Sequence, residues 1–199
     1  MTYDWLLNAK IYKGLFLGMA IYTALALIRI NFIKQNGRWL RVFSHEFTHV
    51  IFSILFFNRI KSFRVGGLFD DGGKVEFYGT PNFAISLAPY CFQLFTFVFL
   101  IIRLITDQTM SIVVDVFIGI AFLFHLTTFW KQARPFQSDI QRHGYIFSYT
   151  FIILINLIFI GMIFSVIKGG FNEFGEYFAN GFNKLYDIII GIINLFTDD

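Results

Sequence analysis

Residues 39–57 read Trp-Leu-Arg-Val-Phe-Ser-His-Glu-Phe-Thr-His-Val-Ile-Phe-Ser-Ile-Leu-Phe-Phe, an apolar helical stretch that contains several ionisable side chains. Its length suits a helix that crosses the hydrocarbon core of a bilayer. An ionised side chain at the centre of a bilayer costs about 2.5–3.5 kcal/mol on insertion scales, so such residues usually have a function. We therefore expect His45, Glu46 and His49 to serve chemistry rather than packing.

These three residues form a complete H-E-x-x-H motif, His45-Glu46-Phe47-Thr48-His49. On a helix, positions four apart share a face, so both imidazoles can bind one zinc ion. Glu46 is then placed to accept a proton from a water molecule at the metal. Catalytic zinc sites normally use three protein ligands, so the motif predicts a further ligand elsewhere in the chain.

The third ligand has several candidates in the sequence, namely Glu76, His125, Asp139, His143, Glu173 and Glu176. Asp139 is favoured because it opens an apolar stretch, where a carboxylate needs a partner. The alternative role for Asp139 is to cap the following helix. His125 is the next candidate, either as a packing residue or as a second-shell residue beside the site. Glu173 or Glu176 would serve in a metallopeptidase whose third ligand is a late glutamate.

The composition indicates a membrane protein. Hydrophobic residues make up 56% of the 199 residues and charged residues only 15%, against roughly 25% charged residues in ordinary globular domains. This argues against a disordered chain and against a soluble enzyme. The formal net charge of +3 is too small to predict a nucleic-acid partner, so the bilayer is the expected surroundings.

Hydropathy along the chain predicts an all-α polytopic membrane protein, with residues 1–199 forming a single domain. About five transmembrane helices are expected, at residues 14–30, 39–57, 83–103, 110–130 and 145–167. Residues 58–82 are predicted to form a β-hairpin, with strands at 60–65 and 74–78 separated by glycine-rich turns. Phenylalanines at steps of three and four predict that residues 171–197 form an amphipathic helix in the membrane interface.

Together these features resemble the site-2 protease family of intramembrane zinc metalloproteases. The matching parts are the H-E-x-x-H helix, the glycine-rich hairpin after it, the Ser86-Leu87-Ala88-Pro89 helix and the late Asp139. The resemblance implies that His45, His49 and Asp139 bind Zn²⁺ near the cytosolic side of the membrane, with Glu46 as general base. The family's usual Leu-Asp-Gly motif is replaced here by Ser138-Asp139-Ile140.

The resemblance implies an endopeptidase that hydrolyses a peptide bond in or near a membrane segment of a substrate protein. The hairpin edge would hold that substrate extended by strand pairing. The alternative, which the missing Leu-Asp-Gly motif favours, is a zinc-binding, non-proteolytic scaffold subunit of a membrane complex. We expect an integral protein of the bacterial inner membrane. A slight excess of Lys and Arg on the hairpin side places the hairpin in the cytoplasm.

Overall fold

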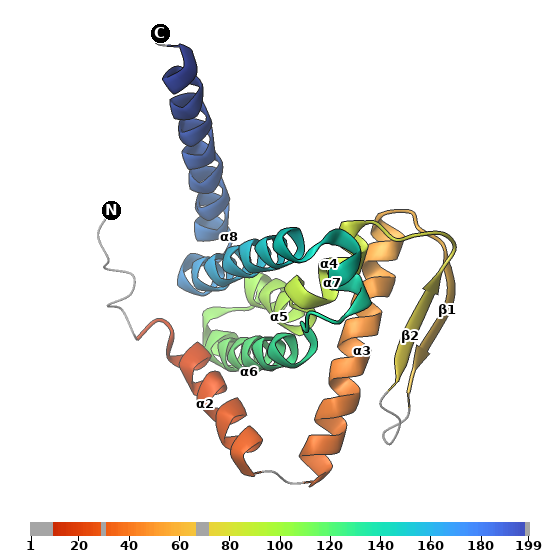
Figure 1. Cartoon of the computed structure of the whole chain (residues 1–199). Helices are drawn as coiled ribbons and strands as arrows, with labels where there is room; N and C mark the ends of the chain where they lie inside the picture. The colour runs from red at the N-terminus through yellow and green to blue at the C-terminus, as the bar shows by residue number, and fades with distance from the viewer. Residues whose placement is uncertain (1–9, 29–30, 67–71, 198–199) are drawn as a thin grey trace.

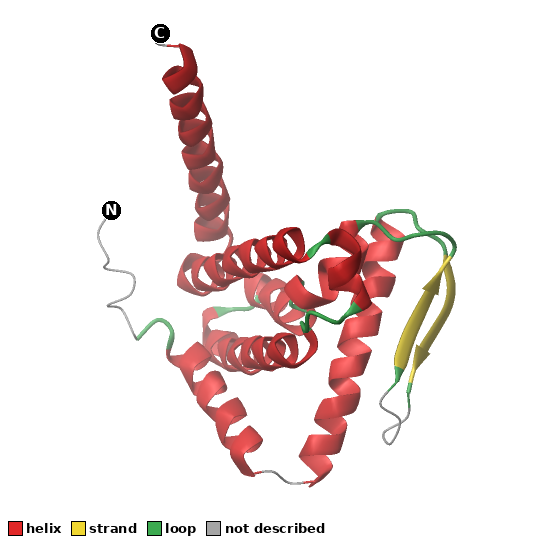
Figure 2. Cartoon of the chain, in the orientation of Figure 1, coloured by secondary structure: helices red, strands yellow, loops and turns green. Residues whose placement is uncertain are grey.

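The computed structural model describes residues 10–28, 31–66 and 72–197, and this part of the chain is mostly helical with one small sheet (Figures 1 and 2). In chain order the elements are α2 (Lys13–Ile28), α3 (Asn31–Leu55), β1 (Ile60–Val65), β2 (Gly73–Phe77), α4 (Phe83–Cys91), α5 (Leu94–Ile105), α6 (Gln108–Gln132), α7 (Ser138–His143) and α8 (Tyr145–Thr197).

Helices α5, α6 and the first part of α8 form a bundle, and α2 packs along α6 (Figure 1). The α2–α6 contact is close because glycines line it. A Cβ atom on Gly18 would meet the backbone of Val116, and one on Gly119 would meet the backbone of Leu15. Small residues spaced four apart, as Gly14 and Gly18 are, allow this approach between membrane helices.

An ion pair joins the helices inside this bundle. Arg103 Nε on α5 lies 2.9 Å from Asp115 Oδ1 on α6, and the Asp115 side chain is only 6% exposed. The same guanidinium donates to the carbonyl of Ile167 on α8, at 3.4 Å. Arg103 therefore connects α5, α6 and α8 next to a hydrophobic core that includes Leu100, Ile118 and Ile163.

The predicted helix at residues 83–103 is broken in the structure. α4 and α5 are bent by 74° at a short break after Cys91, where the Leu94 amide bonds to the carbonyl of Phe92 and not to that of Tyr90. The prediction of one continuous helix was wrong here. The break brings α4 across α3, where the H-E-x-x-H motif lies (Figure 1).

The hairpin was predicted correctly. β1 and β2 pair antiparallel, with Phe63 opposite Val75, and both strands contact α3. The predicted turn residues Gly67, Asp70 and Asp71 lie outside the described residues. Gly66 N donates to Gly72 O at 2.7 Å. Because hydrogen-bonded and non-hydrogen-bonded pairs alternate, the Phe63–Val75 pair is non-hydrogen-bonded, and the backbone of Val75 points away from β1.

α8 continues through the predicted interfacial segment to Thr197, but it is broken at Gly169 and Gly170. Gly170 has φ 61° and ψ −134°, a conformation that favours glycine. Beyond this break the helix turns away from the bundle (Figure 1). Phe182 and Leu185 of the predicted apolar stripe are exposed there.

Two helices among the described residues are long and apolar enough to cross a membrane, Thr109–Gln132 and Tyr145–Leu195, and α4 with α5 makes a third if the bent pair is one span. α2 is apolar but has only 16 residues. α3 is helical over the second predicted span, but the polar residues in it lower its mean hydropathy. The chain is therefore a helical membrane protein, and the count of five spans stays a prediction.

Candidate metal centre

The two motif histidines lie on one face of α3, as their spacing requires. Their rings are 5.0 Å apart and nearly perpendicular. The His49 side chain is 7% exposed and that of His45 is 13% exposed, because α4 covers this face of α3. The sequence thus folds into a helix that presents two adjacent imidazoles to the interior of the protein.

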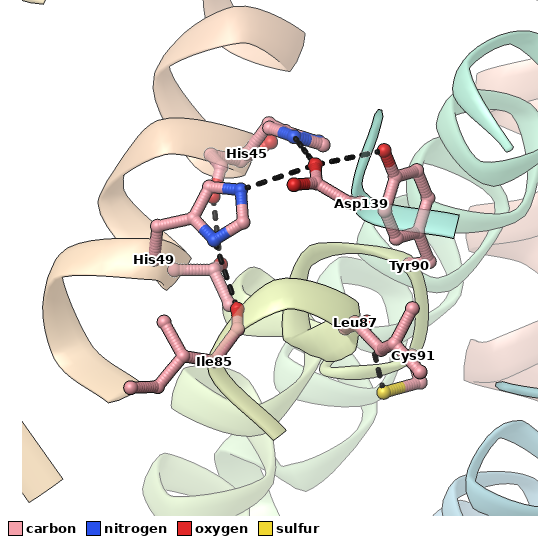
Figure 3. A network of polar contacts seen from close by, with 9 residues as sticks. His45, His49, Ile85, Leu87, Tyr90, Cys91 and Asp139 are labelled. Atoms are coloured by element: carbon pink, nitrogen blue, oxygen red, sulfur yellow. Dashed lines mark hydrogen bonds and ion pairs between the residues drawn. The ribbon is translucent and has the colours of Figure 1, made fainter. Parts of the chain in front are cut away.

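Asp139 reaches the histidines from a distant part of the chain. It lies in the first turn of α7, which begins after α6 has crossed the bundle. Asp139 Oδ2 is 3.7 Å from His49 Nε2 and 4.0 Å from His45 Nε2 (Figure 3). One donor atom from each of the three residues lies within 4.8 Å of the others.

This donor set fits a zinc ion. Two imidazole nitrogens and one carboxylate oxygen are typical zinc ligands, and three ligands at 2.0–2.2 Å in a tetrahedral arrangement lie about 3.3–3.6 Å apart. The two distances from Asp139 Oδ2 to the imidazole nitrogens exceed that range by about 0.1 and 0.4 Å, and all three donor atoms lie within 4.8 Å of one another. Binding an ion here therefore requires the three side chains to move closer together.

A hydrogen bond to α4 orients His49. Its Nδ1 lies 2.9 Å from the carbonyl oxygen of Ile85. A carbonyl only accepts hydrogen bonds, so Nδ1 carries the proton and Nε2 carries the lone pair. Nε2 is the nitrogen that faces Asp139 (Figure 3). Metal-binding histidines usually have such a partner on the second nitrogen, which fixes the tautomer and the ring plane.

Tyr90 of α4 contacts the other two members of the group. Its hydroxyl donates to Asp139 Oδ2 at 3.3 Å, and its ring lies 5.2 Å from the His45 ring. A hydroxyl that donates to Asp139 favours its carboxylate form, which is the form that binds a cation.

Glu46 lies beside the three residues and contacts the hairpin. Its carboxylate interacts electrostatically with His49 and Asp139, and it accepts a hydrogen bond from the backbone of Val75. Gly73 of β2 lies against Glu46 so closely that a Cβ atom there would be 2.5 Å from Glu46 Cγ. The outward edge of β2 therefore runs next to the predicted general base.

Other predicted candidates lie elsewhere. His125 Nε2 is 3.1 Å from Asn156 Oδ1 inside the bundle, and His125 is not one of the three grouped residues. Glu173 pairs with Lys168 at 2.7 Å, beyond the break in α8. The N-cap of α7 is Gln137, so the alternative that Asp139 caps this helix was wrong.

The sequence did not predict three groups that the structure places here, namely the Tyr90 hydroxyl, the Ile85 carbonyl and the Val75 backbone. Tyr90 stands in an apolar run with no neighbouring polar residue that would mark it. A backbone amide is present at almost every position, so only the tertiary arrangement distinguishes that of Val75, whereas the Ile85 carbonyl is marked in the sequence by Pro89 four residues later.

Comparison with known families agrees with this geometry. A model of the family described as peptidase M50B-like matches residues 18–179, which include the H-E-x-x-H helix, the hairpin, α4 and Asp139. No match was found among curated proteins or among solved structures. The matched range covers most of the chain and confirms the resemblance to the site-2 protease family. The chain belongs to the peptidase M50B-like family.

Proposed function

We propose that the protein is a zinc-dependent membrane endopeptidase that hydrolyses a peptide bond in or near a membrane segment of a substrate protein. His45, His49 and Asp139 hold the zinc ion, and Glu46 is the general base. The observation that carries this proposal is the convergence of three donor atoms within 4.8 Å of one another, next to a glutamate.

The chemistry divides between the metal and Glu46. Zinc held by His45, His49 and Asp139 would act as a Lewis acid towards the scissile carbonyl and would lower the pKa of a bound water towards about 7. The Glu46 carboxylate accepts the proton of the attacking water and then transfers it to the leaving amine. Tyr90 and the Ile85 carbonyl keep Asp139 and His49 oriented during both steps.

The hairpin supplies a place for the substrate backbone. The edge of β2 that faces away from β1 lies next to Glu46, whose carboxylate accepts a hydrogen bond from the Val75 backbone there. An extended peptide can add to such an edge as a further strand, with its main chain hydrogen-bonded to β2. A substrate held this way would place a peptide bond beside Glu46, and it would replace the hydrogen bond between Glu46 and Val75.

The test compares zinc content and peptide hydrolysis in Glu46→Gln. The amide fills the same space but accepts no proton, so we expect about one zinc per chain to remain and turnover to fall by about 10²–10⁴-fold. Glu176→Gln, the same substitution at an exposed position on α8, is the control and should cleave like the wild type.

Two results would contradict the proposal. Near wild-type turnover by Glu46→Gln would exclude Glu46 as the base. A wild-type protein that binds zinc but cleaves no membrane substrate, while still assembling with partner proteins, would support the scaffold alternative.

A further inference from the structure

The short helix α4 contacts every member of the candidate metal centre. The Ile85 carbonyl accepts from His49, the Tyr90 hydroxyl donates to Asp139, and the Tyr90 ring packs on His45. The orientation of the three ligand residues therefore depends on how α4 is held. Two backbone carbonyls of α4, those of Ile85 and Tyr90, accept hydrogen bonds from side chains of other helices.

Pro89 makes the first of these carbonyls available. In a regular helix the carbonyl of Ile85 would accept a hydrogen bond from the backbone nitrogen of residue 89. Proline has no N–H, and its ring crowds the carbonyl four residues earlier. The Ile85 carbonyl is thus without its helical donor, and His49 Nδ1 donates to it at 2.9 Å instead. The proline converts a backbone oxygen into a partner for a predicted zinc ligand.

The second carbonyl, that of Tyr90, accepts a hydrogen bond from Asn156 of α8. The helical donor for Tyr90 would be the amide of Leu94, but α4 ends at Cys91 and that amide bonds to the carbonyl of Phe92. Asn156 Nδ2 donates to the Tyr90 carbonyl at 3.1 Å. The side chain of Asn156 therefore replaces the missing backbone donor at the break between α4 and α5.

The Asn156 amide is buried and bonded on both sides. Nδ2 also donates to Ile152 O at 2.9 Å, while Oδ1 lies 3.3 Å from Gln93 Nε2 and 3.1 Å from His125 Nε2. Because two carbonyls face one side of the amide, that side must be the NH₂ group. This network is confined to the interior of the bundle, where exchanging its bonds for water is costly.

We infer that Pro89 and Asn156 are positioning residues for the metal centre, and that they act through the broken helix α4. Pro89 directs the Ile85 carbonyl to His49. Asn156 fixes the end of α4 that carries Tyr90, and Tyr90 holds Asp139. This inference rests on the metal site of the proposed function and assigns no contact with substrate to either residue.

The first test is Pro89→Ala, with Pro81→Ala in the preceding loop as the matched control. Zinc affinity is measured by competition with a chromophoric chelator, and thermal unfolding is measured on the metal-free protein. Alanine restores a helical N–H to the Ile85 carbonyl, so we expect zinc affinity to fall about 10-fold, the low end for partners of ligands. The metal-free protein should unfold at the same or a higher temperature, because alanine favours the helix. Pro81→Ala should leave zinc affinity unchanged.

The second test removes the other contacts one at a time. Asn156→Ala and Tyr90→Phe should each weaken zinc binding about 10-fold and alter the visible absorption of the Co²⁺-substituted protein, which reports ligand geometry. Ser165→Ala on α8, which removes only a bond to Gly161 of its own helix, should change neither. If Asn156→Ala does not fold, Pro89→Ala and Tyr90→Phe decide the outcome.

The results separate this inference from the proposed function. A wild-type protein that binds neither zinc nor cobalt overturns both. Wild-type metal binding with unchanged affinity and spectrum in Pro89→Ala and Tyr90→Phe overturns the positioning role alone. A loss of affinity in Pro89→Ala that is matched by an equal loss of metal-free stability would also overturn it, because the effect would then be general unfolding.

Discussion

Asp139 is the residue on which the candidate centre depends most, because it alone joins the two histidines from a distant segment. Its carboxylate faces both imidazoles and accepts a hydrogen bond from Tyr90. Removing it would leave two nitrogen ligands, one fewer than catalytic zinc sites normally have. It would also leave the buried Tyr90 hydroxyl without its acceptor.

Asp139→Ala is therefore expected to weaken zinc binding by at least about 10-fold. Loss of a ligand should cost at least as much affinity as loss of a residue that positions a ligand, which typically costs about 10–100-fold. Asp139→Asn keeps the shape but not the charge, and it should fall between alanine and the wild type. The measurement is zinc affinity by chelator competition. Asp107→Ala, at an exposed position before α6, is the control. Wild-type affinity in Asp139→Ala would exclude Asp139 as a ligand.

At this scale the sequence predicted the residues that belong to a motif, and it missed those that depend on tertiary contacts. His45, Glu46 and His49 were identified by spacing, and Asp139 by the cost of placing a carboxylate next to an apolar span. No sequence feature of this kind pointed to Tyr90. The Ile85 carbonyl could have been identified as an available acceptor, because a proline inside a helix deprives the carbonyl four residues earlier of its donor.

Among the elements, α2 and α6 are joined by a close backbone contact at glycines. A Cβ atom at Gly18 would overlap the backbone of Val116, which cannot move aside as a side chain can. Gly14 and Gly18 are one helical turn apart in an apolar segment, so this packing face was visible in the sequence and could have been predicted. An irregularity in α4 could likewise have been expected from Pro89, whereas the 74° bend after Cys91 could not.

Gly18→Ala should lower stability by about 1–3 kcal/mol, the usual range for overpacking. Thermal unfolding in detergent measures the change. Gly175→Ala is the matched control, because a Cβ atom at Gly175 meets no other atom within 4 Å. There the better helix propensity of alanine should leave stability unchanged or raise it by up to about 1 kcal/mol. Equal effects at the two positions would show that α2 does not pack on α6 through glycine.

For the molecule as a whole, the Arg103–Asp115 pair connects α5, α6 and α8. Asp115→Ala leaves the Arg103 charge inside the bundle, and breaking a buried pair in this way costs about 3–5 kcal/mol. Replacing both partners by apolar residues of similar size is often nearly neutral. We therefore expect the double variant Arg103→Met, Asp115→Leu to unfold closer to the wild-type temperature than Asp115→Ala does. The reverse order would show that the pair does not act as a unit.

The orientation of the chain in the membrane gives a further prediction. If α4 and α5 together make one span, the hairpin and the start of α6 lie on opposite sides. Single cysteines placed by Ser62→Cys and Asp107→Cys, both at exposed positions, are tested in a Cys91→Ala background with a membrane-impermeant reagent. Ser62→Cys should react only from the cytoplasmic side and Asp107→Cys only from the other. Labelling of both from one side would instead make the bent pair a re-entrant loop.

The wide separation of the ligand residues along the chain also has a consequence for biosynthesis. His45 and His49 leave the ribosome early, but Asp139 follows only after the hairpin and helices α4, α5 and α6 have been made. A nascent chain that ends before α7 therefore has two of the three proposed zinc ligands and the proposed base, but not Asp139. If the proposed function holds, the order of translation keeps the growing polypeptide inactive until most of its helices are available for insertion.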